Sequence, residues 1–200
     1  MLSLVIQAGG KSSRMGSDKA LMPFLGRPLI ERVIQRLIHL ADEMLITTNV
    51  PDEYRFLNIP LIPDKIPGRG ALGGLYTALE AASHPLVAVI ACDLPFVNAG
   101  ILLLSQHALI DTRIDAVIPS TKQGLEPLHA VYRRETCLPA VKDAIANNQW
   151  RLISWHQAVT VHIIGENEIQ RCDPDGLAFW NLNTPQAFQE AENIARLSDQ

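Results

Sequence analysis

The sequence is poor in cysteine, in aromatic residues and in excess positive charge. Its three cysteines, Cys92, Cys137 and Cys172, are scattered and form no Cys-x-x-Cys pair, which argues against a disulfide framework and against a zinc site. Lys and Arg number 17 against 21 Asp and Glu, for a formal net charge of -4. General nucleic-acid binders usually carry clustered positive charge. We therefore expect any phosphate binding to be local, and no nucleic-acid partner.

A long apolar run is also missing. No stretch reaches the roughly 18 residues that a membrane-spanning helix needs, and Met1 to Ala8 has neither the length nor the basic leader of a signal peptide. We expect a cytoplasmic protein with no membrane partner. With 200 residues, 48% of them hydrophobic and 19% charged, the chain can bury one substantial core, so we expect a single domain over residues 1–200.

Short apolar runs alternate with segments of helical period. The expected strands are Leu2 to Ala8, Met44 to Thr48, Leu86 to Ala91, Ala116 to Ile118, Ala158 to Ile164 and Ala178 to Leu182. The expected helices are Pro28 to Leu40, Leu72 to Ala82, Ala99 to Ala108, Thr136 to Ala146 and Pro185 to Leu197. Several strands lack polar alternation, as strands buried on both faces do. The order predicts an α/β fold whose mainly parallel, Rossmann-like sheet is covered by helices and binds ligands at the strand ends.

A glycine-rich loop follows the first expected strand, over residues 7–19. Gly9 and Gly10 let the backbone turn sharply and bring N–H donors close to a phosphate, while Arg14 and Lys19 supply positive charge. The spacing matches neither a P-loop nor the dinucleotide fingerprint. A polyphosphate ligand is therefore expected, and a kinase or a dehydrogenase has little support.

A carboxylate follows the apolar run that ends at Ala91. Asp93 should lie at the C-terminal edge of a buried strand, on the same side of the sheet as the glycine loop. A reacting triphosphate needs a hard divalent cation, and Asp is the usual protein ligand of Mg²⁺. We expect Asp93 to be the magnesium ligand, although an Asp at this place can instead cap the helix that follows.

Together these motifs resemble the molybdenum cofactor guanylyltransferases, whose opening motif is Leu-Ala-Gly-Gly-x-Ser-x-Arg-Met-Gly-x-Asp-Lys. Residues 7–19 match every fixed position except the first, where Gln7 replaces Leu. The family's Cys-Asp-x-Pro is similar to residues 92–95, and its Gly-x-Gly-Pro-Leu-x-Gly to residues 68–74, with Ala71 where proline is common. Its Asn-x-Asn-Thr-Pro signature is similar to residues 181–185. The resemblance extends over nearly the whole chain.

The resemblance implies a nucleotidyltransferase of glycosyltransferase-A-like fold that uses Mg²⁺. In the reaction it implies, the phosphate of molybdopterin attacks the α-phosphorus of GTP, expels pyrophosphate and forms molybdopterin guanine dinucleotide. It also implies protein partners that deliver the molybdenum cofactor or accept it.

The same resemblance assigns the site residues. The catalytic residues are Lys19, Arg14 and Asp93, with Asp93 also holding the metal. The GTP-binding residues are Gln7, Ala8, Gly9, Gly10, Lys19, Asn49, Asp64 and Asp93. The acceptor-side residues are Asn181 and Asn183, with His129 as a weaker candidate. Residues spaced by one along a strand share a face, so the two asparagines are expected to bind one ligand together, although Asn183 and Thr184 are equally suited to capping a helix that begins at Pro185.

Two other functions remain open. Cytidylyl- and sugar-1-phosphate nucleotidyltransferases share the glycine-rich loop, the lysine and the strand-end Asp, but their loop usually carries Ala-Ala-Gly where this chain has Ala8, Gly9 and Gly10. A non-catalytic nucleotide-binding regulator is the second alternative. A pure binder needs no metal-bridging carboxylate, so the presence of Asp93 argues against it.

Overall fold

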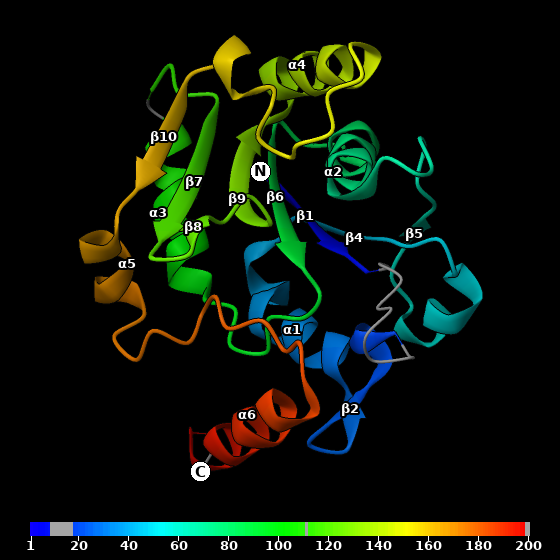
Figure 1. Ribbon diagram of the computed structural model, residues 1–200, viewed down its shortest axis with the longest axis vertical. Coiled ribbons are helices and arrows are strands. Elements are labelled where there is room, and N and C mark those ends of the chain that lie inside the picture. Colours follow the sequence, from blue (N-terminus) through cyan, green and yellow to red (C-terminus); the bar gives the residue numbers. More distant parts are fainter. Residues whose placement is uncertain (9–17, 111, 199–200) are drawn as a thin grey trace.

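The computed structural model describes residues 1–8, 18–110 and 112–198, which fold around an eight-stranded sheet (Figure 1). The strand order is β10-β7-β9-β6-β1-β4-β5, and β8 pairs with β7. The strands of this sheet are β1 (Leu2–Gln7), β4 (Glu43–Thr47), β5 (Leu61–Ile62), β6 (Leu86–Ala91), β7 (Ala116–Thr121), β8 (Gly124–Leu125), β9 (His129–Arg133) and β10 (Val161–Ile164). A separate hairpin is formed by β2 (Pro23–Phe24) and β3 (Arg27–Pro28).

Most neighbours in the sheet are parallel. Strand β1 pairs in parallel with β4 and β6, and β4 with β5. Strand β9 is antiparallel to both β6 and β7, and β7 is parallel to β10. All the long strands except β9 therefore share one direction, which confirms the expected mainly parallel α/β fold. The C-terminal ends of these strands form one edge of the sheet, where ligands bind in open α/β folds.

The helices cover both faces of the sheet (Figure 1). The α-helices are α1 (Leu29–Leu37), α2 (Gly70–Ala81), α3 (Ala99–Ile110), α4 (Arg134–Ala146), α5 (Glu166–Cys172) and α6 (Pro185–Ser198). The 3-10 helices are η1 (Lys19–Leu21), η2 (Ile38–Leu40), η3 (Pro51–Leu57) and η4 (His156–Ala158). No helix among the described residues has both the length and the apolar character needed to cross a membrane.

Successive side chains of the central strands pack into two separate hydrophobic cores, one on each face of the sheet. In β1, Leu4 and Ile6 belong to the cluster that α1 and α3 complete, whereas Val5 belongs to the cluster completed by α2 and α4. Successive residues of a strand point to opposite faces, so an uninterrupted apolar run serves both layers. This explains why the run Leu86 to Ala91, whose residues divide between the same two clusters, shows no polar alternation. Removing apolar surface from water stabilises the fold by about 25 cal/mol per Å². Strands that bury both faces gain this free energy twice, which favours their place in the middle of the sheet.

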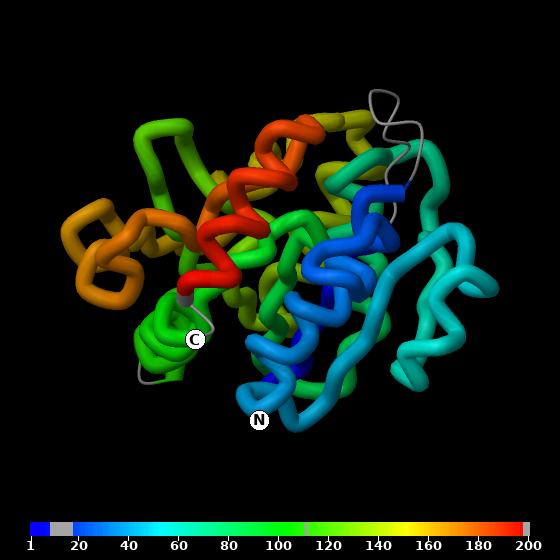
Figure 2. The backbone as a smooth tube through the Cα atoms, turned by 90° about the horizontal axis from the view of Figure 1, so that it is seen from below, coloured from blue at the N-terminus to red at the C-terminus, as the bar shows by residue number. Residues whose placement is uncertain are grey.

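A third core lies at the edge where the parallel strands end. Helix α6 packs Phe188 against Phe24 of the β2–β3 hairpin and against Phe96 and Leu182. Figure 2 shows α6 from this side, crossing in front of much of the chain. The closing helix therefore holds the segment before it, residues 173–184, against the ligand-binding edge.

The expected helices are all present, with boundaries shifted by a few residues. Helix α1 is shorter than expected because Pro28 precedes it in an extended conformation and residues 38–40 continue as 3-10 helix. Strand β9 and helix α5 were not predicted, since neither the mixed stretch 124–132 nor the polar stretch 166–172 shows clear periodicity.

The strand expected over Ala178 to Leu182 is wrong. These residues form turns and irregular backbone, and single hydrogen bonds hold them in place of a ladder. The Asp173 carboxylate accepts from the Ala178 N–H at 2.8 Å, and the Leu182 N–H donates to the Asp93 carbonyl at 3.2 Å. Just before this segment, Gly176 has a φ of +68°, a left-handed conformation that turns the chain.

Candidate active site

Lys19 and Asp93 meet at the C-terminal edge of the sheet. Asp93 comes two residues after β6, and the Lys19 ammonium lies 3.2 Å from its carboxylate. Their side chains are only 18% and 20% exposed, so the pair is largely shielded from water. Asp93 does not cap the next helix, because the Asn98 side chain accepts from the Ile101 N–H there at 3.2 Å. The capping interpretation of Asp93 therefore fails, and its carboxylate faces the site.

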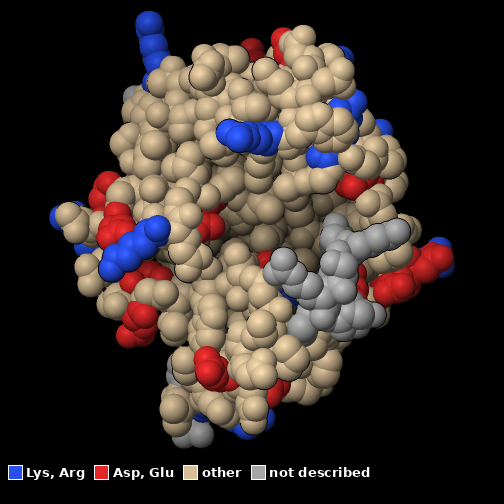
Figure 3. Space-filling view, viewed as in Figure 1, with Lys and Arg blue, Asp and Glu red and all other residues tan. Residues whose placement is uncertain are grey.

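Asn183 completes this group from the C-terminal part of the chain. Its side-chain oxygen accepts a 2.5 Å hydrogen bond from the Lys19 ammonium. The cap of α6 is instead Thr184, whose hydroxyl accepts from a backbone N–H of that helix at 3.1 Å. Residues far apart in the sequence thus converge on one cation. In the same view as Figure 1, Figure 3 shows the molecule hollowed near its centre, over the region where β6 ends.

Asn181 is not brought into this group. The argument that the two asparagines share one face required a strand, and residues 178–182 form none. Asn181 is exposed, and among the described residues its side chain makes no hydrogen bond that the structure records. Its assignment to the acceptor stays a prediction.

Asn49 and Asp64 form a second pair at the same edge. They follow β4 and β5, two neighbouring parallel strands. The Asn49 amide donates to the Asp64 carboxylate at 2.8 Å, and the Asp64 backbone N–H donates back to the Asn49 side-chain oxygen at 3.2 Å. The two hydrogen bonds fix the orientation of both side chains. One oxygen of the Asp64 carboxylate has no recorded bond to Asn49 and can accept from a ligand.

Gln7 and Ala8 close the end of β1. The Gln7 carbonyl accepts from the Cys92 N–H at 3.2 Å, and the Ala8 N–H donates to the Thr47 carbonyl at 2.8 Å, so both groups are used within the sheet. The Gln7 side chain lies against Gly74, where an added Cβ would stand 2.8 Å from its oxygen. Its amide nitrogen is buried and has no hydrogen-bond partner among the described residues. A ligand acceptor would satisfy this donor.

Gly9, Gly10 and Arg14 lie outside the described residues. Their predicted contacts with the nucleotide stay predictions on the sequence alone.

Asp18 and Tyr54 form hydrogen bonds that fix the start of η1, where Lys19 lies. One oxygen of the Asp18 carboxylate accepts from the Ala20 N–H at 3.0 Å and so caps η1, which begins at Lys19. The other accepts a 2.5 Å hydrogen bond from the hydroxyl of Tyr54, which is fully buried. Burial, together with this hydrogen bond, raises the pKa of Tyr54 well above its usual range, so its proton stays available to Asp18. The sequence reasoning missed Tyr54, which is the one buried side chain of η3.

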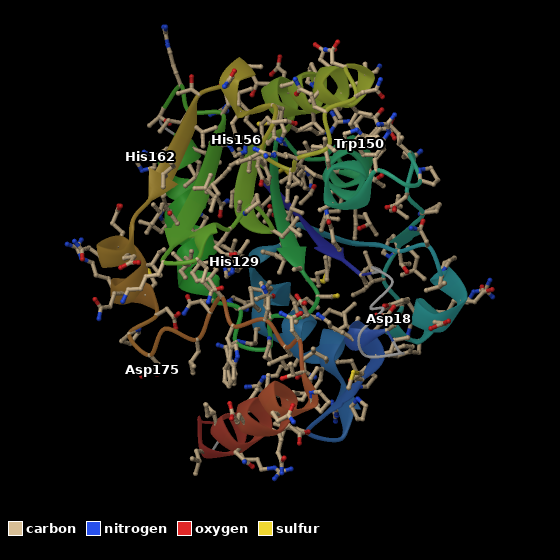
Figure 4. All side chains as sticks on the ribbon, viewed as in Figure 1. Asp18, His129, Trp150, His156, His162 and Asp175 are labelled. Atoms are coloured by element: carbon tan, nitrogen blue, oxygen red, sulfur yellow. The ribbon has the colours of Figure 1, made fainter. Side chains whose placement is uncertain are left out.

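His129 is buried near the strand ends (Figure 4). Burial lowers its pKa to about 4, against a small opposing effect of the Asn98 backbone, so the ring is neutral at pH 7. Neither ring nitrogen has a hydrogen-bond partner of ordinary geometry among the described residues, and the ring packs on Phe179 at 4.7 Å between centroids. A neutral ring is a poor partner for an anionic phosphate. In Figure 4 the unassigned His156 and His162 lie well away from this edge.

The described residues hold no group of three or more His, Cys, Asp or Glu side chains that would bind a metal by themselves. Mg²⁺ is usually held by one or two carboxylates together with substrate phosphates and waters, so a single carboxylate is sufficient when a triphosphate is bound. Asp93 fits this requirement, because one oxygen faces Lys19 and the other has no recorded partner among residues 1–8, 18–110 and 112–198. The site is therefore suited to a metal that arrives with its nucleotide.

Known proteins are similar to this chain in sequence and in fold. Residues 4–160 match the family model described as the MobA-like NTP transferase domain. A molybdenum cofactor guanylyltransferase of Desulfosudis oleivorans is 34% identical, covering 94% of this chain and 93% of its own. A probable molybdenum cofactor guanylyltransferase of Carboxydothermus hydrogenoformans is 35% identical, covering 99% and 98%. The crystal structure of molybdopterin-guanine dinucleotide biosynthesis protein A from Archaeoglobus fulgidus superimposes with a TM-score of 0.80 at 23% identity, covering 98% and 99%.

Proposed function

Because this chain belongs to the family of MobA-like NTP transferases, we propose that it transfers GMP from GTP to the phosphate of molybdopterin. Pyrophosphate leaves and molybdopterin guanine dinucleotide forms. The observation that carries the proposal is the convergence of Lys19, Asp93 and Asn183 at the end of β6, in a chain that covers its guanylyltransferase relatives almost end to end.

In this reaction an oxygen of the acceptor phosphate forms a bond to the α-phosphorus of GTP while the bond to the bridging oxygen of pyrophosphate breaks. The attacking phosphate is already anionic, so no general base is needed. Catalysis then depends on alignment and on stabilising the charge that develops on the phosphates. Lys19 supplies a shielded positive charge at this place, and a second is proposed from Arg14 on the sequence alone.

We propose Mg²⁺ as the metal and Asp93 as its protein ligand. Bound Mg²⁺ would neutralise charge on the triphosphate as pyrophosphate departs. The Asp93 carboxylate is held by the Lys19 ammonium, and the Asp93 carbonyl by the Leu182 N–H, so the ligand is preoriented.

We assign one side of the site to the nucleotide and the other side to the acceptor. On the nucleotide side we place Gln7, Ala8, Gly9, Gly10, Asn49 and Asp64. Of these, Gln7, Asn49 and Asp64 lie at the ends of β1, β4 and β5, and the fixed Asp64 carboxylate offers an acceptor for a base or a ribose. On the acceptor side we place Asn181 and Asn183, which precede α6.

The direct test is pyrophosphate release by the purified protein with GTP, Mg²⁺ and molybdopterin. We expect one pyrophosphate for each dinucleotide formed and none when molybdopterin is omitted. If the protein binds GTP but releases no pyrophosphate with the acceptor present, it is a nucleotide-binding regulator and the catalytic proposal is wrong.

Among nucleotides, GTP should bind in preference to CTP, ATP and UTP. Gly9 and Gly10 leave room for a purine, and a pocket that pairs with guanine leaves buried groups unpaired with another base. Such mismatches give about 100-fold or greater discrimination. Competition binding of the four triphosphates in Mg²⁺ measures the preference. Equal binding of CTP would replace the guanylyl assignment by a cytidylyl one.

Replacing Tyr54 by Phe should lower kcat about tenfold while the KM for GTP stays nearly unchanged, because one charge-assisted hydrogen bond to Asp18 is lost and Lys19 is held less firmly. Tyr76→Phe is the matched control, since it removes a similar phenol–carboxylate hydrogen bond, to Glu80, on α2. Steady-state kinetics and thermal unfolding of both variants are compared. Equal kcat values for the two variants would show that Tyr54 has only a structural role.

A further inference from the structure

A cavity opens at the ligand-binding edge, away from the Lys19–Asp93 pair. Its volume is about 490 Å³, and it is lined by residues of the turn between β7 and β8, of α5 and of the segment 173–180. Cavities of this size bind small molecules. No residue proposed above for GTP, for the metal or for the phosphates lines it.

Two aromatic side chains, Phe179 and Trp180, line this cavity, and each packs against another ring. Trp180 is stacked on Phe96, with 6.0 Å between ring centroids and an interplanar angle of 13°. Phe179 packs against the buried ring of His129. Both rings are partly buried and both line the cavity. Aromatic side chains whose orientation is fixed by packing on other rings form a surface on which a flat heteroaromatic ring can stack.

Carboxylates also line this cavity. Asp173 is buried and is already used, since it accepts from the Ala178 N–H and so shapes the loop. Asp175 and Glu166 are exposed, and the described residues provide neither with a recorded ion pair or hydrogen bond. In Figure 4 Asp175 lies on the loop that follows α5. An unpaired carboxylate accepts two parallel hydrogen bonds from a planar edge that carries adjacent N–H donors.

The cavity lies at a suitable distance from the reacting phosphates. It is placed at the ends of β7 and β10, and only β9 separates β7 from β6, which carries Asp93. Two strand spacings amount to about 10 Å. Along the chain, the three residues from Trp180 to Asn183 span at most about 10 Å. One acceptor molecule can therefore place a ring in the cavity and a phosphate beside Lys19.

From these observations we propose that this cavity binds the pterin ring of the acceptor, with Phe179 and Trp180 stacking on the ring and Asp175 accepting from its 2-amino-4-oxopyrimidine edge. The inference rests on the proposed function, which makes a pterin phosphate the acceptor. Guanine has the same hydrogen-bonding edge. The Asn49–Asp64 pair, however, lies on the other side of β6, where the nucleotide half is placed, so the cavity is assigned to the pterin.

The test uses 6-hydroxymethylpterin, which carries the ring without the phosphate, and the full-length protein. Calorimetry is expected to show pterin binding by the wild type, and about tenfold weaker binding by Asp175→Asn and by Phe179→Leu. Asp143→Asn, a change of an exposed carboxylate on α4, is the matched control and should bind pterin normally. All variants should bind GTP with unchanged affinity, which also shows that they are folded.

The possible results distinguish failure of the cavity assignment from failure of the proposed reaction. Unchanged pterin affinity in both cavity variants, or displacement of the pterin by guanosine, overturns the cavity assignment. So does the absence of pterin binding in a wild-type protein that still converts molybdopterin to its guanine dinucleotide. If pterin binding depends on Asp175 and Phe179 but no transfer of GMP occurs, the cavity assignment stands and the proposed reaction fails.

Discussion

Replacing Asp93 by Asn is expected to lower turnover about 100-fold or more while leaving the protein folded. A weakened metal ligand forfeits several kcal/mol of charge stabilisation, and each 1.4 kcal/mol corresponds to about a tenfold change in rate. The fold should survive because Asn has the shape of Asp and the Asp93 carbonyl still accepts from the Leu182 N–H. Activity is measured over a range of Mg²⁺ concentrations, with Asp143→Asn as the control and thermal unfolding as the check on folding.

The Asp93 carboxylate also contacts Lys19, so its effect on activity could arise from a displaced ammonium alone. A double-mutant cycle separates the two explanations, since residues that act only through each other show no further loss when both are changed. We expect Asp93→Asn to reduce activity again in a Lys19→Ala background. Near-wild-type activity of the single variant in saturating Mg²⁺ would exclude the metal role.

Much of this site could be predicted because it depends on strand ends. Asp93 directly follows a buried strand, and Lys19 closes the loop after another, so a parallel sheet brings both to one edge whatever the detailed loop path. The pairing of Asn49 with Asp64 follows the same rule, because β4 and β5 are neighbours, but it was not predicted, since β5 was not among the expected strands. These positions are set by topology, and the apolar runs reveal the topology.

Other parts depend on tertiary contacts that leave no periodic signal. Strand β9 is inserted antiparallel between β6 and β7, and nothing in its own residues specifies that direction. The run before α6 looks like a strand in its composition, but Asp173 and Asp93 hold it by single backbone contacts. Tyr54 could not be predicted either, since its role appears only when η3 packs behind the capping carboxylate of Asp18.

The last prediction concerns Lys19, whose replacement by Ala should lower kcat/KM by at least about 100-fold, the scale of losing one preorganised electrostatic stabiliser. The Lys19 side chain is only 18% exposed and its ammonium is bound by both Asp93 and Asn183, so its position is set before the substrates bind. Charge that grows on the phosphates during the reaction gains more from such a fixed cation than the ground state does, and the loss should therefore appear mainly in kcat.

Lys65→Ala is the matched control for this change. Its ammonium lies 3.4 Å from the Glu80 carboxylate, but that pair is 52% and 36% exposed and belongs to the surface. Exposed pairs contribute little, typically about 0–1 kcal/mol, so the control should keep both its stability and its activity. If Lys19→Ala instead lowers only the melting temperature and retains its kcat/KM, Lys19 is a structural partner of Asp93 and the positive charge for the transition state must come from Arg14.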